Sequence, residues 1–303
     1  MRRSRAFGAA LVLVLIATPA VGPGRARTAD HVVVVSKVSQ IVAPKPGLPF
    51  QYQLQTGPGS RFAATGGIDV SLCRAPAIGA KRCVRPRVFD IDLYGPNGTT
   101  PNATAVHDIV AAGSYAICYV DAGTWESWRP DANRFPSSVL GRPNGWPGER
   151  WLDIRDRAVL LPIMAGRVRK CREAGFQAVE FDNVDGFAND TGFPITASEQ
   201  LTYNRDLAAI AHRAGLAAGL KNDYSQVRAL ETVFNFAVDE SCWIYRECHL
   251  LEPFVAHHKA VFDVEYGLSP ARLRRYCSTV SRMGISGVGK SLSLFALPWE
   301  PCG

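Results

Sequence analysis

Short hydrophobic runs of strand length recur along the chain, and most of them are separated by segments with helical signals. They are rich in Val, Ile, Phe and Tyr, which favour strands, and they end in polar or turn-forming residues. Such alternation is typical of parallel strands joined by helical crossovers. The eight predicted strands occupy residues 50–55, 88–94, 115–122, 177–185, 216–223, 233–240, 260–266 and 285–291.

The segments between these runs carry helix start and stop signals. Thr196 and Glu199 form a capping-box pattern before a predicted helix that Gly215 ends. Ser269 followed by Pro270 is the pattern of an N-cap and first helical residue, and that helix stops at Gly284. A third helix is predicted near 157–174. Each stop falls just before a strand, as βα repetition requires.

Eight strands in this order predict an α/β fold, a single (β/α)8 TIM barrel. A doubly wound open sheet is the alternative, but no glycine-rich phosphate loop follows the first strand. Residues 56–87 lack a helical pattern, which predicts an irregular, disulfide-tied first connection. Residues 123–156, rich in Trp, Pro and Gly, predict a long loop, and such loops commonly build barrel active sites.

The first residues have the pattern of a secretion signal. Three arginines precede the apolar residues 7–19, and small residues follow. We therefore expect a signal peptide over 1–22, a flexible leader over 23–40 and a catalytic barrel domain over 41–303 of a secreted, monomeric protein. A membrane anchor is the alternative for the apolar run. No other stretch is long and apolar enough to span a bilayer, so no stable membrane insertion is expected.

Composition and charge exclude several classes of protein. Hydrophobic residues make up 47% of the chain, which is enough for a full core. The formal net charge of +7 falls to +4 when the three signal arginines are removed. No dense Lys/Arg run with interleaved aromatic residues is present, so we expect no nucleic-acid partner.

Eight cysteines in an exported chain favour disulfides. Spacing pairs Cys73 with Cys83, Cys242 with Cys248, and Cys277 with Cys302, the last tying the tail to the final helix. Cys118 in a strand and Cys171 in a helix are also compatible with buried thiols. No His/Cys cluster has zinc spacing, and no metal or other cofactor is expected.

Alternation along the strands predicts which charged residues enter the barrel, because neighbouring residues face opposite sides. With Phe89, Val179 and Phe262 taken as facing the helices, the residues predicted to point inward are Asp90, Asp92, Glu180, Asp182, Lys221, Asp263 and Glu265. Any single one could be part of a structural ion pair. Together, several carboxylates at a barrel mouth suit glycoside hydrolysis.

The aromatic residues of the predicted loops would stack on sugar rings; they are Trp125, Trp128, Trp146, Trp151, Trp243 and Tyr245.

At this point the motifs resemble those of glycoside hydrolase family 114, the endo-α-1,4-polygalactosaminidases. The matching segments cover most of residues 50–267 in order. They are FQYQLQ at 50, VFDIDLYG at 88, ICYVDAGTWESWRPD at 117, GWPGERWLDIR at 145, VEFDNVDGF at 179, GLKND at 219, AVDESCWIYREC at 237 and VFDVEY at 261.

The resemblance implies a TIM barrel that cleaves galactosamine linkages within a galactosaminogalactan-type polysaccharide. It places the catalytic acids at Asp182 and Glu240, with retention of configuration favoured. The residues expected to line the sugar site are Asp90, Asp92, Tyr119, Asp121, Trp125, Trp151, Asp185, Lys221, Asn222, Tyr245 and Glu265. Strand alternation groups Glu240 with Phe236 and Val238 on the apparent outward face, which leaves Asp239 as a rival to Glu240.

Two alternative functions stay open on the sequence. A glycosidase of other α-galactoside specificity would keep the same acids, because loop shape decides the substrate. A non-catalytic polysaccharide-binding barrel would keep the aromatic residues and lose one acid. Asp182 and Glu240 are both present, which favours an enzyme.

Overall fold

The structure, a computed structural model, describes residues 40–57, 67–79 and 82–303, so the predicted signal peptide and almost all of the leader lie outside it. All eight predicted strands are confirmed. They are β1 (Phe50–Gln53), β2 (Val88–Asp92), β3 (Tyr115–Asp121), β7 (Ala178–Asp182), β8 (Ala217–Lys221), β9 (Phe236–Glu240), β10 (Ala260–Tyr266) and β11 (Ser286–Lys290).

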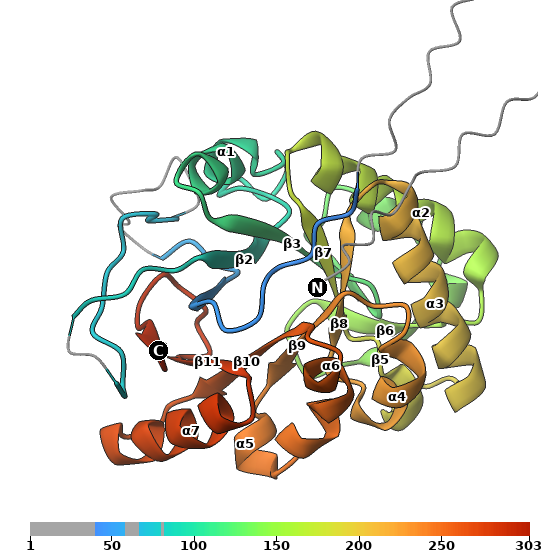
Figure 1. Cartoon of the computed structure of the whole chain (residues 1–303). Helices are drawn as coiled ribbons and strands as arrows, with labels where there is room; N and C mark the ends of the chain where they lie inside the picture. The colour runs from blue at the N-terminus through green and yellow to red at the C-terminus, as the bar shows by residue number, and fades with distance from the viewer. Residues whose placement is uncertain (1–39, 58–66, 80–81) are drawn as a thin grey trace, which may run out of the picture. The chain divides into compact units, whose positions relative to one another are not determined.

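These strands form one sheet in the order β1-β2-β3-β7-β8-β9-β10-β11, each parallel to its neighbour. The sheet curls into a nearly closed barrel with helices on its outside (Figure 1). The predicted TIM-barrel fold is thus confirmed. All carboxyl ends of the strands consequently meet at one rim.

The crossovers contain helices that begin and end where the sequence signals lie. They are α1 (Ala103–Ala111), α2 (Arg157–Glu173), α3 (Ala197–Arg213), α4 (Val227–Leu230), α5 (Cys242–Tyr245), α6 (Glu252–Ala256) and α7 (Pro270–Arg282). The capping box of Thr196 and Glu199 is confirmed, whereas Ser269 caps α7 without a side-chain hydrogen bond. Within the described ranges, no helix is both long and apolar enough to cross a membrane.

Two of the connections between barrel strands are not simple helical crossovers. The described parts of 56–87 contain no helix, in agreement with the irregular first connection predicted. The predicted loop 123–156 instead folds into a small antiparallel sheet in the order β4-β6-β5. Its strands are β4 (Thr124–Glu126), β5 (Leu140–Pro143) and β6 (Glu149–Leu152). This sheet sits directly after β3, so it covers part of the carboxyl-end rim.

Two apolar layers lie on the two faces of the barrel strands. Phe89, Val179 and Phe181 belong to the layer between strands and helices, as predicted. Phe236, Phe262 and Val264 instead fill the barrel interior, together with Phe50. The ring of Phe50 stacks on that of Phe262 with centroids 4.6 Å apart.

The predicted inward orientation of Asp263 and Glu265 is therefore wrong. Residues of β10 alternate, and its apolar side chains point into the barrel, so these carboxylates face the helix layer. The same alternation in β9 places Glu240 inside with Phe236 and Val238, and Asp239 outside. The apparent conflict between strand alternation and Glu240 came from treating every apolar residue as outward.

The C-terminal tail covers the seam between β1 and β11, the two ends of the barrel. Strand β12 (Glu300–Pro301) pairs antiparallel with β11, and the Trp299 indole donates a hydrogen bond to the Phe50 carbonyl at 2.8 Å. Lys290 donates to the Gln51 side chain at 2.9 Å and to the Phe295 carbonyl at 2.6 Å. The tail thus replaces the direct hydrogen bonds that would close the barrel.

Four disulfides join all eight cysteines. The three pairs inferred from spacing, Cys73–Cys83, Cys242–Cys248 and Cys277–Cys302, are confirmed. Cys118 and Cys171, which the sequence left open as buried thiols, also form a disulfide. It links β3 to α2 across the layer of apolar residues between strand and helix, where their Cα atoms lie 6.0 Å apart.

Candidate active site

A lysine joins the two predicted catalytic acids at the carboxyl ends of three neighbouring strands. Lys221 ends β8, and its Nζ lies 3.0 Å from Asp182 Oδ1 at the end of β7 and 2.9 Å from Glu240 Oε2 at the end of β9. Because one ammonium contacts both, these two carboxylate oxygens lie at most about 6 Å apart, a limit that admits the separation of retaining glycosidases.

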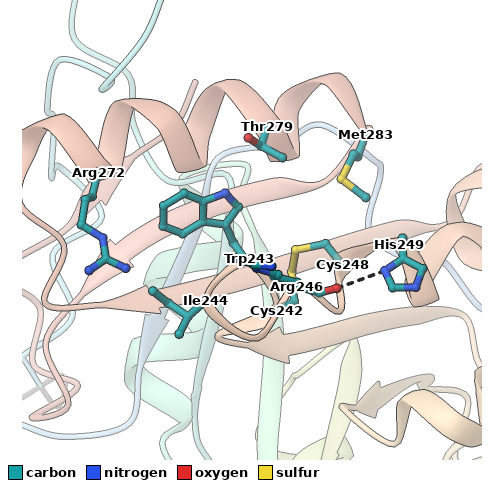
Figure 2. A pocket seen from close by; sticks show the side chains of 9 residues that line it. All are labelled: Cys242, Trp243, Ile244, Arg246, Cys248, His249, Arg272, Thr279 and Met283. Atoms are coloured by element: carbon teal, nitrogen blue, oxygen red, sulfur yellow. Dashed lines mark hydrogen bonds between the residues drawn. A yellow bond between two sulfur atoms is a disulfide. The ribbon is translucent and has the colours of Figure 1, made fainter.

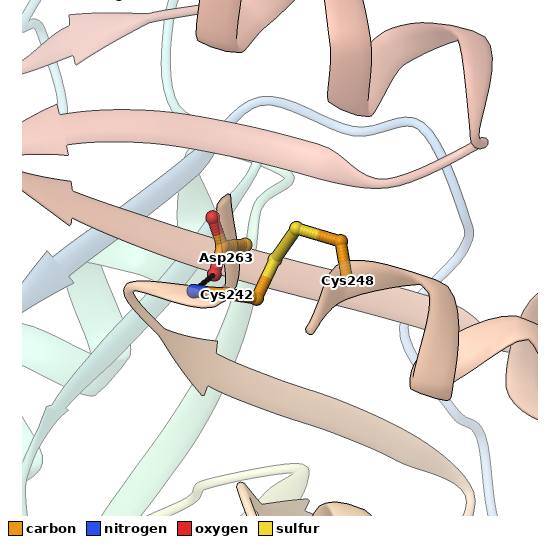
Figure 3. A group of neighbouring side chains, drawn as sticks. All are labelled: Cys242, Cys248 and Asp263. Atoms are coloured by element: carbon orange, nitrogen blue, oxygen red, sulfur yellow. Dashed lines mark hydrogen bonds between the residues drawn. A yellow bond between two sulfur atoms is a disulfide. The ribbon is translucent and has the colours of Figure 1, made fainter. Parts of the chain in front are cut away.

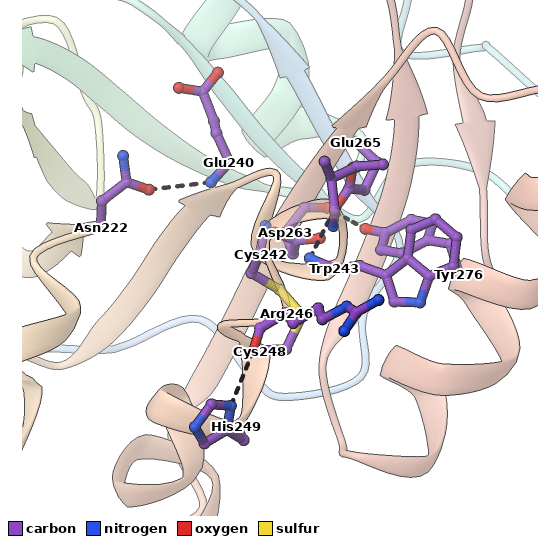
Figure 4. The surroundings of a disulfide bond; sticks show 11 residues. Asn222, Glu240, Cys242, Trp243, Arg246, Cys248, His249, Asp263, Glu265 and Tyr276 are labelled. Carbon is purple, nitrogen blue, oxygen red and sulfur yellow. Dashed lines mark hydrogen bonds between the residues drawn. A yellow bond between two sulfur atoms is a disulfide. The ribbon is translucent and has the colours of Figure 1, made fainter.

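Tyrosines and backbone amides fix the orientation of both acids. Tyr119 donates to Asp182 Oδ2 at 2.7 Å, and the Asn183 backbone amide donates to Oδ1 at 2.8 Å. Tyr266 at the end of β10 donates to Glu240 Oε1. The backbone amide of Glu240 donates to the Asn222 side chain at 3.1 Å, as Figure 4 shows. Both acids remain partly exposed, so they can reach a ligand.

The charges around Lys221 determine which groups are ionised. Burial would raise the pKa of Asp182, but the Lys221 ammonium and the donors Tyr119 and Asn183 outweigh it and lower that pKa. Burial would also lower the pKa of Lys221, yet Asp182 and Glu240 raise it well above its usual value. Asp182 is therefore a carboxylate beside a permanent ammonium ion, the state that a nucleophile requires.

A second pair of carboxyl groups lies beneath this site, inside the barrel. Asp90 on β2 and Glu180 on β7 interact electrostatically, and both are completely buried. Glu180 Oε1 accepts a hydrogen bond from Tyr52 at 3.4 Å and lies 3.7 Å from Lys221 Nζ. Burial raises the pKa of Asp90 to about 7 and that of Glu180 well above its usual value, so the pair retains a proton at neutral pH. Asp90 is thus part of the floor of the site and not an exposed sugar contact.

Asp92 and Asp121 are held by other residues of the rim. The guanidinium of Arg129, which follows β4, binds both oxygens of Asp92 at 2.7 Å and Glu126 at 2.6 Å. Asp121 accepts hydrogen bonds from the backbone amides of Gly123 and Thr124 and from the Asn183 side chain. These contacts connect the small sheet to β2, β3 and β7.

Among the described residues, two groups have the composition of a metal site. Oxygens of Asp121, Glu126 and Glu149 lie within 4.8 Å of one another, but each accepts hydrogen bonds from protein groups. Cys242 and Cys248 lie beside Asp263, but their sulfurs are joined in a disulfide and offer no thiolate (Figure 3).

The aromatic residues separate into packed and exposed members. Trp151 is buried, and Trp125 is half-buried, with its indole nitrogen bonded to the Ala132 carbonyl at 3.1 Å. The side chains of Trp128, Trp146 and Tyr245 are exposed, by 48%, 56% and 69%. The rings of Trp128 and Trp146, which lie in the connections of the small sheet, are therefore more accessible for stacking on a sugar than Trp125 and Trp151, which were predicted to line the sugar site.

Glu265 is not brought together with the other predicted site residues. Its Oε1 accepts hydrogen bonds from the backbone amides of Trp243 and Ile244 at 2.8 and 3.1 Å, and Asp263 accepts one from Cys242 at 3.2 Å. Figure 4 shows both carboxylates beside this disulfide-linked turn, which follows Glu240. The sequence reasoning placed Glu265 at the sugar, whereas it holds the backbone of α5.

One predicted residue, Asp185, lies near Asp182, and two tyrosines that contact the site were not predicted. Asp185 follows β7, where burial and the charge of Asp182 raise its pKa. Tyr52 and Tyr266 were not predicted as site residues, although both lie within the strand motifs quoted above. A tyrosine at an inward position can be either core or hydrogen-bond donor, so alternation alone does not reveal its role.

Comparison with known proteins adds to this geometry. The sequence matches the model of glycoside-hydrolase family GH114 over residues 34–301. The structure is similar to that of Ega3 from Aspergillus fumigatus in complex with galactosamine, with a TM-score of 0.70 and 28% sequence identity over 85% of this chain and 96% of that chain. A search of curated protein sequences finds no match.

Two further structures share the fold alone. One is the glycoside hydrolase domain of PelA from Pseudomonas aeruginosa, with a TM-score of 0.57 and 14% identity over 84% of this chain and 98% of that chain. The other is TtGalA, an α-galactosidase from Thermus thermophilus, with a TM-score of 0.52 and 16% identity over 86% of this chain and 61% of that chain.

Proposed function

This chain belongs to glycoside hydrolase family GH114, and from that premise we propose that it cleaves α-1,4-galactosamine linkages inside a galactosaminogalactan-type polysaccharide. The observation that carries the proposal is the contact of one ammonium, Lys221, with both Asp182 and Glu240. Two carboxyl groups at this spacing are the machinery of a retaining glycosidase. The galactosamine bound in the related Ega3 structure supports the choice of sugar.

The surroundings of the two acids support different roles for them. Asp182 has a lowered pKa and three donors, so it would attack the anomeric carbon as a carboxylate. Glu240 has the larger exposed fraction, 29% against 16%, and would protonate the leaving oxygen and later activate water. Lys221 would offset the repulsion between the two carboxylates, keep them close together, and release Glu240 when a substrate enters.

Acidic groups at the rim suit a cationic sugar. Asp185 and Glu149 both have pKa values that burial raises first and the charge of Asp182 raises further, so negative potential accumulates here. An ammonium group of deacetylated galactosamine would relieve that potential. This local acidity matters because the chain as a whole is basic, with a formal charge of +7.

Export of the chain stays part of the proposal. The predicted signal peptide over 1–22 would be removed on export, and the secreted protein would begin with the leader over 23–40, followed by the catalytic domain over 41–303. Four disulfides in the described residues support an oxidising compartment. N-terminal sequencing of protein recovered from the culture medium tests this: a first residue before position 20 would contradict it.

The test of function is incubation with partially deacetylated galactosaminogalactan and mass analysis of the products. We expect oligosaccharides from the wild-type protein and none from Asp182→Asn. Single sugars as the only products would indicate an exo-acting enzyme of other α-galactoside specificity. Binding without products would indicate a non-catalytic polysaccharide-binding barrel, and either result would overturn the proposal.

A further inference from the structure

A basic hollow lies on the outside of the barrel, between α7 and the disulfide-linked turn of α5. It consists of two adjoining parts of about 470 and 630 Å³ that share Trp243 and Thr279. Figure 2 shows the residues that line the first part. Its walls carry exposed cationic or ionisable side chains, which are Arg246, His249, Arg272, Arg274, Arg275 and Arg282. The hollow is separate from the carboxylates of the candidate active site.

The arginines of this hollow form no ion pair with a described residue, and only Arg272 has another contact, with the ring of Trp243 at 5.7 Å. The buried Glu265 carboxylate also interacts electrostatically with Arg272. Helix α2 is also rich in arginine, but three of its arginines form ion pairs. Arg157 pairs with Asp206, Arg167 with Asp131, and Arg169 with Glu173.

The arginines of α7 lower the stability of this helix. The helix contains four arginines and no acidic residue. Arg272 lies in the first turn, where the helix dipole disfavours a cation. Arg275 and Arg282 follow at spacings of three and seven residues, on the same side of the helix, so the like charges repel each other. A row of roughly 15 Å results, since a helix rises about 1.5 Å per residue.

We propose that this hollow binds an acidic polysaccharide, a chain that carries carboxylate groups. The planar guanidinium forms paired hydrogen bonds with a carboxylate, and a row of arginines matches a chain of such groups. The galactosamine polymer itself would be repelled, so the two sites accept different glycans. The hollow would hold the enzyme on an anionic matrix while the rim cleaves a cationic chain.

Two other anionic partners are alternatives to an acidic polysaccharide. A single-stranded nucleic acid binds through bases stacked on free aromatic faces, but the ring of Trp243 already contacts Arg272 at 5.7 Å and Tyr276 at 6.0 Å. A membrane surface with anionic lipids is the second alternative, and tighter binding to such vesicles is the contrary outcome of the experiment below. A linear acidic glycan can enter the hollow along the axis of α7.

The experiment measures binding of the protein to polygalacturonate by affinity electrophoresis at low and high salt, with dextran as the neutral control. The test variant combines Arg272→Gln, Arg275→Gln and Arg282→Gln. The matched control removes three exposed arginines of α2 and α3 that have no ion pair among the described residues. Its substitutions are Arg172→Gln, Arg205→Gln and Arg213→Gln.

We expect binding that weakens with salt and falls at least about tenfold in the test variant, with less than about twofold change in the control. Thermal unfolding of both variants checks that they fold. Equal weakening in both variants would show unspecific attraction by net charge and overturn the proposal. Absence of binding by the wild-type protein, or tighter binding to vesicles that contain phosphatidylserine, would overturn it as well.

Discussion

At the scale of residues, the candidate site is a compact electrostatic unit centred on Lys221. The lysine is 2% exposed, and it lies among Asp182, Glu240 and the buried pair of Asp90 and Glu180. A buried ammonium needs such compensation, because removing its partners would leave an unpaired charge inside the barrel. The same contacts keep the two proposed catalytic acids close together before a substrate binds.

The assignment of Glu240 over Asp239 can be tested by paired substitutions. Glu240→Gln keeps the shape but removes the proton donor, so we expect kcat to fall by at least about 10³-fold. Asp239 faces the helix layer, and burial raises its pKa well above the usual value. Asp239→Asn should therefore lose little activity in a reducing-sugar assay. The opposite pattern would exchange the two roles.

Gly123 makes room for the segment that carries Asp182. A Cβ atom at this position would lie 1.6 Å from the Asn183 carbonyl oxygen, and the Gly123 amide donates to the Asp182 carbonyl. We expect Gly123→Ala to displace Asp182 and reduce kcat at least about tenfold, since small misplacements of a reacting group are costly. Gly95→Ala, whose nearest neighbour would be 3.6 Å away, is the control. Full activity of the Gly123 variant would disprove this role.

At the scale of elements, the C-terminal tail completes the barrel that the strands leave open. Trp299 is fully buried, and the Cys277–Cys302 disulfide fixes the tail to α7. We expect Cys277→Ser with Cys302→Ser to lower the free energy of unfolding by about 3 kcal/mol in a denaturant titration. The matching double substitution at Cys73 and Cys83 should cost less, because that pair ties a surface loop. A larger loss there would contradict the role given to the tail.

The contact between β10 and α5 should make stability depend on pH. Burial and then the charge of Glu265 raise the pKa of Asp263 to about 8, so its proton remains in the folded state while the unfolded chain loses it near pH 4. This group therefore destabilises the fold increasingly as pH rises from about 4 to 8. Asp263→Asn should remove that loss and still accept the Cys242 amide.

The predicted gain in the free energy of unfolding is roughly 2–4 kcal/mol at pH 8 and close to zero at pH 4. Chemical denaturation of the variant and the wild-type protein at both pH values measures it. If the variant's gain in the free energy of unfolding over wild type were no larger at pH 8 than at pH 4, Asp263 would be ionised in the folded protein, and the prediction would be wrong.

At the scale of the whole molecule, sequence reasoning succeeded where one strand face was polar. The inward positions of Asp182 and Lys221 follow from alternation, because their neighbours Phe181 and Leu220 pack under helices. It failed in β10, where the barrel interior is itself apolar and Phe262 gives no sign of which face it occupies. Alternation assigns faces only when the two faces differ in polarity.

Other features depend on contacts that are remote in sequence. The Cys118–Cys171 disulfide requires α2 to pack on β3, and residues 53 positions apart carry no local signal of it. The small sheet of β4, β5 and β6 was predicted as a loop because its strands are three or four residues long and the whole segment 123–156 is rich in Trp, Pro and Gly. Such short strands are stabilised by their pairing and not by their own composition.

The central claim is that Asp182 attacks the sugar while Glu240 serves as acid and base. The most direct test is mass analysis of Glu240→Gln after incubation with a galactosamine oligosaccharide that has an activated leaving group. Such a substrate needs no acid for the first step, and the variant lacks the base for the second. We predict a covalent glycosyl adduct that peptide mapping places on Asp182. An adduct on another residue, or turnover with inverted configuration and no adduct, would contradict the account.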